Sequence, residues 1–221
     1  MKLKTLLLGT HQSKLGKTHH FITLLIRLSL LGAIIPSIFT QRWLVLFISL
    51  LTFVLTFLPR IFERTYKIDI PIELEIIIVI FIYAAIFLGE VHGYYTRFWW
   101  WDAILHTGSG IALGFIGFAI MLILFRGGKI KASPRTIALL SFSFAVAMGA
   151  VWEIFEFSID QLFNTNMQKN GLVDTMWDLI VDSVGAIFAS LIGYIYIKKG
   201  QTPIFNNIIK KFIENNPDLF R

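Results

Sequence analysis

The stretch at residues 101–125 reads WDAILHTGSGIALGFIGFAIMLILF. At a rise of about 1.5 Å per residue, a helix of this length crosses a hydrocarbon core of about 30 Å. Its two ionisable side chains, Asp102 and His106, lie one helical turn apart near the start. The stretch therefore predicts a transmembrane helix that carries an acid and an imidazole near one end.

The composition of the whole chain agrees with a membrane protein. Of its 221 residues, 56% are hydrophobic and 15% are charged, and the mean hydropathy is +0.70. Soluble domains carry about 25% charged residues, so a soluble globular class is excluded. The chain has no cysteine, which excludes disulfides and thiolate chemistry.

Apolar runs elsewhere in the chain predict further spans. Lipid cannot satisfy free backbone groups, and the runs lack the alternation of barrel strands, so the spans are expected to be helices. We therefore predict an all-α, polytopic transmembrane helical bundle with about six spans, at 21–40, 43–59, 70–90, 101–125, 136–158 and 175–197. The expected organisation is an N-terminal segment at 1–20, a single transmembrane domain at 21–197, and a tail at 198–221 with a short amphipathic helix around 203–213.

The basic residues predict the orientation of these spans. Sixteen of the twenty lysines and arginines fall on one side of the predicted membrane, and the other side has Arg42, Arg97 and Lys169. The positive-inside rule then places both termini and the tail in the cytoplasm and the chain in the plasma (inner) membrane. The net charge of +6 is thus explained by topology, and no nucleic-acid partner is expected. Membrane lipids are the expected partners, and the pattern does not specify an oligomeric state.

The acidic residues gather at the opposite, external side. Eight of the fourteen carboxylates lie there, namely Glu90, Asp102, Glu153, Glu156, Asp160, Asp174, Asp178 and Asp182. An ionisable group within a span costs roughly 2.5–3.5 kcal/mol on insertion scales unless it is paired or faces water. Such a concentration predicts a polar cavity in the outer half of the membrane.

Helical spacing predicts which of these groups meet. Residues four apart lie on one face of a helix, as Asp174, Asp178 and Asp182 do. The external groups expected to converge come from three spans and are Asp102, His106, Glu153, Glu156, Asp178 and Asp182. Small residues in the fourth and sixth spans permit close helix packing, namely Gly108, Gly110, Gly114, Gly117, Gly185 and Ala186.

Structural roles explain part of the pattern equally well. Asp174 precedes an apolar run, as a helix N-cap does, and Asp102 and Asp160 are placed to contact headgroup water. Arg97 or Lys169 can neutralise one or two carboxylates, but not all eight.

The deeper residues favour a chemical role. Carboxylate oxygens with one imidazole suit divalent ions such as Mg, Mn, Ca or Zn. We therefore predict His106, Glu156, Asp178 and Asp102 as metal ligands, and Glu153 and Asp182, the deepest acids, as catalytic residues.

These residues also lie in motifs that resemble a known family. Trp101-Asp102-Ala-Ile-Leu-His106-Thr-Gly-Ser-Gly110, Glu153-Ile-Phe-Glu156 and Asp174-Thr-Met-Trp-Asp178-Leu-Ile-Val-Asp182-Ser-Val-Gly185-Ala resemble YjdF-type bacterial membrane proteins, over roughly 90–195. They are more distantly similar to VanZ-like proteins. The resemblance implies a polytopic inner-membrane protein. It supplies no reaction, and the VanZ-like relatives' link to glycopeptide tolerance suggests the cell envelope.

Three classes of function fit these observations. The first is a metal-dependent hydrolase or transferase that acts on a lipid or polyprenyl-phosphate headgroup. The second is a cation- or proton-coupled transporter, and the third is a non-catalytic envelope or scaffold protein. The cytoplasmic halves of the fourth and sixth spans offer almost no polar path, which favours the enzyme over the transporter.

Overall fold

The computed structural model describes residues 14–169, 171–202 and 204–221, and these residues are helical without strands. Within them, six helical segments are long and apolar enough to cross a membrane. They are Leu15–Phe39, Trp43–Tyr66, Ile72–Val91, Trp101–Arg126, Pro134–Phe163 and Leu172–Lys199. The predicted all-α membrane bundle with six spans is therefore confirmed. Of the predicted N-terminal segment, residues 1–13 lie outside the described part.

The contacts divide the chain into two compact units, one up to Phe98 and one from Trp99. The first unit contains α2 (Lys14–Phe39), α3 (Trp43–Leu55), α4 (Leu58–Tyr66), α5 (Ile72–Ile82), a π-helix η1 (Tyr83–Val91) and α6 (Tyr94–Arg97). Its buried core consists of Ile26, Leu30, Val79 and Phe87.

The second span is longer than predicted because it is two helices. The helix α3 ends at Leu55, and Pro59 stands in the first turn of α4. Proline has no backbone N–H and its ring clashes with the carbonyl four residues back, so a continuous helix breaks here. The helix α4 then continues through Arg60, Glu63 and Arg64, which a search for apolar residues alone leaves out.

This break also explains an arginine within the first span. Arg27 donates from Nε to the Thr56 hydroxyl at 3.1 Å and from Nη2 to the Thr56 carbonyl at 3.2 Å. Its guanidinium lies 3.8 Å from the centroid of the Phe57 ring. The break between α3 and α4 thus supplies the partners that a charged group requires inside a membrane.

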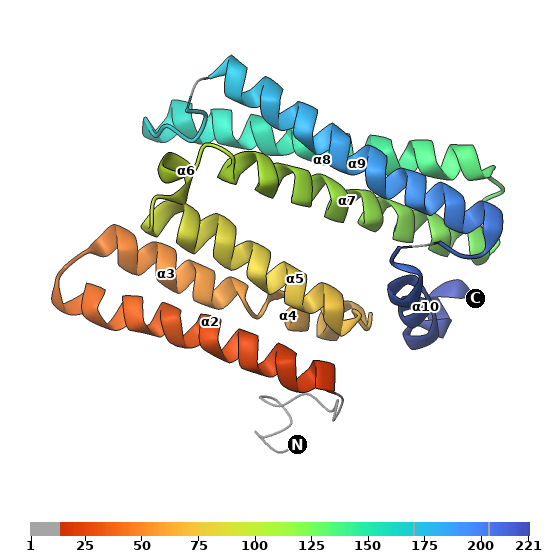
Figure 1. Cartoon of the computed structure of the whole chain (residues 1–221), viewed down its shortest axis with the longest axis horizontal. Coiled ribbons are helices and arrows are strands. Elements are labelled where there is room, and N and C mark those ends of the chain that lie inside the picture. Colours follow the sequence, from red (N-terminus) through yellow and green to blue (C-terminus); the bar gives the residue numbers. More distant parts are fainter. Residues whose placement is uncertain (1–13, 170, 203) are drawn as a thin grey trace. The chain divides into compact units, whose positions relative to one another are not determined.

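The second unit is built on three long helices. These are α7 (Trp101–Arg126), α8 (Pro134–Phe163) and α9 (Leu172–Lys199), followed by α10 (Asn206–Asn215) and a 3-10 helix η2 (Pro217–Phe220). The three long helices lie side by side, and α7 and α9 run parallel while α8 runs against them (Figure 1). The start of α7, the end of α8 and the start of α9 therefore lie at the same end of this unit.

The opposite end of the unit is filled by hydrophobic side chains. Its buried cluster contains Phe118, Met121, Leu122, Ile137, Tyr196 and Ile209. Ile209 belongs to α10, so this helix packs on the core cluster through Ile209. The other end, at the start of α7, the end of α8 and the start of α9, carries the acidic residues. The two ends of the unit therefore differ chemically.

Glycines bring α7 and α9 into close contact. A Cβ on Gly110 would collide with the backbone carbonyl of Asp182, and a Cβ on Gly185 would collide with that of Thr107. A Cβ on Gly114 would lie 2.7 Å from the Cβ of Ala189 and 3.5 Å from the Cα of Ala186. Small residues permit such close backbone approach within membranes, and here they bring the acidic face of α9 against α7.

Candidate functional site

The helix α7 contributes the imidazole around which the site is organised. His106 is buried, and its Nε2 lies 3.7 Å from Oδ1 of Asp102, one turn earlier. Ser109, three residues later, is on the same face of the helix, and its hydroxyl lies 2.9 Å from Oδ1 of Asp182. Three polar groups of α7 therefore point toward α9.

The helix α9 contributes two buried aspartates to the same imidazole. His106 Nε2 lies 3.9 Å from Asp178 Oδ2, and His106 Nδ1 lies 3.3 Å from Asp182 Oδ2. Because the two aspartates are four residues apart, each faces a different nitrogen of the ring. We call Asp102, His106, Asp178 and Asp182 the His106 cluster.

The helix α8 brings a glutamate next to this cluster. The Asp182 carboxylate rests on Gly149, where a Cβ would lie 2.7 Å from Oδ2, and Glu153 follows Gly149 by one turn. Glu153 is only 4% exposed, and among the described residues neither of its carboxylate oxygens has a hydrogen-bond partner. A buried polar group without a partner costs roughly 1–3 kcal/mol, and more when charged. Glu153 is therefore in an environment that favours a bound partner.

Glu156 lies at the edge of this arrangement. It is half-buried, and its Oε1 accepts a hydrogen bond from the Trp152 indole at 3.0 Å. The structure thus brings Asp102, Asp178 and Asp182 around His106 and places Glu153 beside them. Glu156 makes its side-chain hydrogen bond within α8.

The loop between α8 and α9 supplies a cation that the sequence analysis did not include in the site. Lys169 Nζ donates to Asp102 Oδ2 at 2.6 Å, and the backbone N–H of Lys169 donates to Asp174 Oδ2 at 3.1 Å. The prediction that Asp174 caps the helix is wrong, because α9 begins at Leu172 with Gly171 as its N-cap residue. Asp174 instead fixes the loop from within the first turn.

Asp160 shapes the same loop. Its carboxylate accepts hydrogen bonds from the Thr165 hydroxyl at 2.6 Å and from the backbone N–H groups of Met167 and Gln168 at 2.7 and 2.9 Å. Asp160 therefore has its acceptor capacity largely filled by the protein. The sequence did hold a signal for the pairing of Lys169 with Asp102. Lys169 is the basic residue between the fifth and sixth predicted spans, on the side where the acidic residues gather.

Part of the His106 cluster is arranged as a cation site would be. One ligand atom from each of Asp102, His106 and Asp178 lies within 4.8 Å of the other two. Ligands of Mg, Zn or Ca lie about 2.0–2.6 Å from the ion, so two ligands of one ion are at most about 5 Å apart. The two carboxylates and the imidazole are therefore close enough to share one divalent ion.

Comparison with known proteins places the chain in a family. Residues 19–199 match the family described as Predicted membrane protein (DUF2238), so the chain belongs to that family. It is also 27% identical over 138 residues to an uncharacterized protein of Thermotoga maritima, a match that covers 62% of this chain and 70% of the relative. No solved structure matches the chain. These findings confirm the resemblance to a membrane protein family of unknown function.

Proposed function

We propose that the protein is a metal-dependent hydrolase or transferase that acts on a phosphate-bearing lipid headgroup, such as that of a phospholipid or a polyprenyl phosphate. The observation that carries this proposal is the grouping of ligand atoms from Asp102, His106 and Asp178 within 4.8 Å of one another. A divalent ion in such a site polarises a phosphoryl oxygen or activates a water molecule.

The neighbouring residues support distinct roles around such an ion. Glu153 is the proposed general base, since its carboxylate is buried beside the cluster and accepts no hydrogen bond of good geometry from the described residues. Asp182 is proposed to orient His106, because it contacts Nδ1 and leaves Nε2 toward Asp102 and Asp178. A carboxylate in this position fixes the tautomer and the ring orientation of a ligating histidine. Glu156 is proposed as a further ligand or a charge at the entrance.

The packing of the second unit argues against a conduit for ions. The three helices that carry the acidic residues end in the hydrophobic cluster of Phe118, Leu122, Ile137 and Tyr196, each at most 3% exposed. A transported cation would have to pass this cluster, in which the polar side-chain group is the Tyr196 hydroxyl, contacted by the Arg126 guanidinium at 3.3 Å. A site open at one end fits an enzyme better than a transporter.

An activity assay tests the proposal. Purified protein in lipid nanodiscs, stripped with a chelator and resupplied with Mg, Mn, Ca or Zn, is offered polyprenyl diphosphate and short-chain phospholipids. We expect metal-dependent release of phosphate or headgroup, and a rate for Glu153→Gln lower by about 10²–10⁴-fold, as for loss of a general base. If neither the phosphoanhydride of the diphosphate nor a phosphate ester is cleaved while proteoliposomes conduct divalent ions or protons, the transporter replaces the enzyme.

The proposed site faces the outside of the cell, and this orientation gives a separate prediction. Because sixteen basic residues lie on the other side, we expect residue 165 to be external and residue 215 to be cytoplasmic. Fusions of alkaline phosphatase, active only outside, and of a fluorescent protein, active only inside, at these two positions measure this. Cytoplasmic signal at residue 165 would place the site at the inner leaflet instead.

A further inference from the structure

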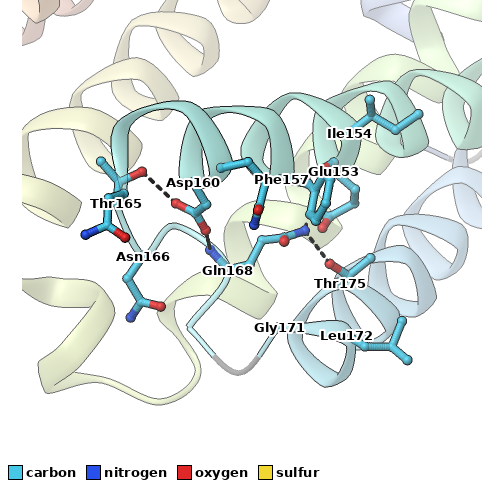
Figure 2. A pocket seen from close by; sticks show the side chains of 12 residues that line it. Glu153, Ile154, Phe157, Asp160, Thr165, Asn166, Gln168, Gly171, Leu172 and Thr175 are labelled. Carbon is cyan, nitrogen blue, oxygen red and sulfur yellow. Dashed lines mark hydrogen bonds between the residues drawn. The ribbon is translucent and has the colours of Figure 1, made fainter.

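A cavity of about 580 Å³ lies beside the His106 cluster, between the end of α8, the following loop and the start of α9 (Figure 2). It is lined by Glu153, Ile154, Phe157, Asp160, Gln161, Asn164, Thr165, Asn166, Gln168, Gly171, Leu172 and Thr175. Asp102, His106 and Asp178 are not part of its wall. Small-molecule sites in proteins have volumes of about 300–1,000 Å³, so the cavity is large enough for a headgroup.

Most of the polar groups in the wall are uncharged. They are the side-chain amides of Gln161, Asn164, Asn166 and Gln168 and the hydroxyls of Thr165 and Thr175. Each amide offers both donors and acceptors, and each hydroxyl offers both as well. The wall also has apolar surface from Phe157, Ile154 and Leu172. This combination suits a ligand with several hydroxyl groups on a short carbon skeleton better than a compact ion.

The two carboxylates in the wall differ in what they can still accept. Asp160 already accepts three hydrogen bonds from its own loop. Glu153, in contrast, is 4% exposed, and among the described residues neither of its oxygens accepts a hydrogen bond of good geometry, although the side chains of Thr175 and Gln168 interact with it. Beside it, the Gln168 amide donates to the Thr175 hydroxyl at 2.7 Å, which fixes this part of the wall (Figure 2). Of the two carboxylates, Glu153 is thus the one with more acceptor capacity left by the described residues.

We infer that this cavity binds the vicinal hydroxyl groups of a lipid headgroup, a glycerol or a sugar, and that these hydroxyls donate hydrogen bonds to Glu153. The inference rests on the proposed function, since it names the class of headgroup that the enzyme takes. The phosphate of such a lipid then faces the His106 cluster, because Glu153 lies in the cavity wall next to that cluster. An anionic group is disfavoured in the cavity itself, because Glu153 and Asp160 both face it.

A binding measurement tests the inference without depending on catalysis. Protein in nanodiscs, with chelator present throughout, is titrated with dioctanoyl phosphatidylglycerol and with dioctanoyl phosphatidylethanol, which has the same phosphate charge and no hydroxyl. Octyl glucoside, against an octyl ether of tetraethylene glycol, tests for a sugar. Native mass spectrometry reports the bound fraction.

At least one hydroxyl-bearing probe is expected to bind at least about tenfold more tightly than its matched partner without vicinal hydroxyl groups. The pair with the larger difference in affinity shows whether the headgroup is a glycerol or a sugar. Glu153→Gln should weaken this binding by about 10–100-fold, as expected for hydrogen bonds to a charged acceptor. Ser158→Ala is the matched control on α8, since Ser158 bonds to the Ile154 carbonyl and does not line the cavity. Its binding should be unchanged.

A second variant separates binding from folding. Glu153→Leu removes a buried carboxylate whose oxygens accept no hydrogen bond of good geometry from the described residues, so it should raise the melting temperature of the ligand-free protein while abolishing binding. Equal binding of both probes in each pair, or unchanged binding in Glu153→Gln, overturns the inference. Dioctanoyl phosphatidylethanolamine is titrated in the same way, and if it binds more tightly than phosphatidylglycerol, through its amine on Glu153, the inference is overturned as well.

Metal content measured on the same purified protein before the chelator is added distinguishes this result from the proposed function. If the protein holds metal but binds both probes of each pair equally, the proposed function stands and the inference about the headgroup is wrong. If the protein prefers the hydroxyl-bearing probes but holds no metal, the headgroup site stands and the metal-dependent reaction is wrong.

Discussion

Asp178→Asn is expected to lower the bound divalent metal to less than about a tenth of the wild-type content. Asp178 supplies one of the three ligand atoms that lie within 4.8 Å of one another, and a neutral amide oxygen is a far weaker ligand than a carboxylate. Without metal, the same substitution also removes repulsion between neighbouring carboxylates. The metal-free variant should therefore be as stable as metal-free wild type.

The matched control is Asp174→Asn, one turn earlier on α9. Asp174 is half-buried and accepts the Lys169 backbone N–H, and it is not part of the three-ligand grouping. Its metal content should remain close to that of wild type. Elemental mass spectrometry gives the stoichiometry, and equal metal in Asp178→Asn and wild type would remove Asp178 from the ligand set.

Gly110→Ala is expected to destabilise the second unit strongly, whereas Gly108→Ala on the same helix is expected to be tolerated. A Cβ at Gly110 collides with the Asp182 backbone, while a Cβ at Gly108 meets nothing within 4 Å. Overpacking of this kind costs about 1–3 kcal/mol, which corresponds to a fall in melting temperature of roughly 2–12 °C. Gly108→Ala should raise helix stability slightly, because alanine is the better helix former.

Thermal unfolding of both variants in the same detergent measures the difference. Since the collision also moves Asp182 away from His106, Gly110→Ala should lose metal as well as stability. If both variants have the melting temperature of the wild-type protein, α7 and α9 do not pack closely at Gly110.

Much of the fold could be predicted from the sequence because membranes impose a simple rule. A run of about twenty apolar residues has few alternatives to a spanning helix, so six runs gave six spans. The ends were less accurate, because helices continue past the apolar run. The first span begins at Leu15 instead of 21, and the second ends at Tyr66 instead of 59.

The candidate site was predictable where it depended on helical spacing. Asp102 and His106, and Asp178 and Asp182, are each four residues apart, so each pair had to share a face. Their contact across α7 and α9 depended further on Gly110 and Gly185, whose partners only the structure identifies.

The loop between α8 and α9 was beyond such reasoning. Lys169 reaches Asp102 because Asp160 and Asp174 accept backbone N–H groups of the loop. These bonds have no periodic signal in the sequence. The cavity beside Glu153 is formed by the same loop, and for that reason it too emerged only from the structure.

Metal analysis of the purified wild-type protein alongside His106→Ala is the most direct test of the central claim, that the acidic end of α7, α8 and α9 is a divalent-metal site. The account predicts at least one Mg, Mn, Ca or Zn ion per wild-type chain, a melting temperature that falls when a chelator is added, and loss of both properties in His106→Ala. Wild-type protein without bound metal, and with a melting temperature that the chelator does not change, would contradict it.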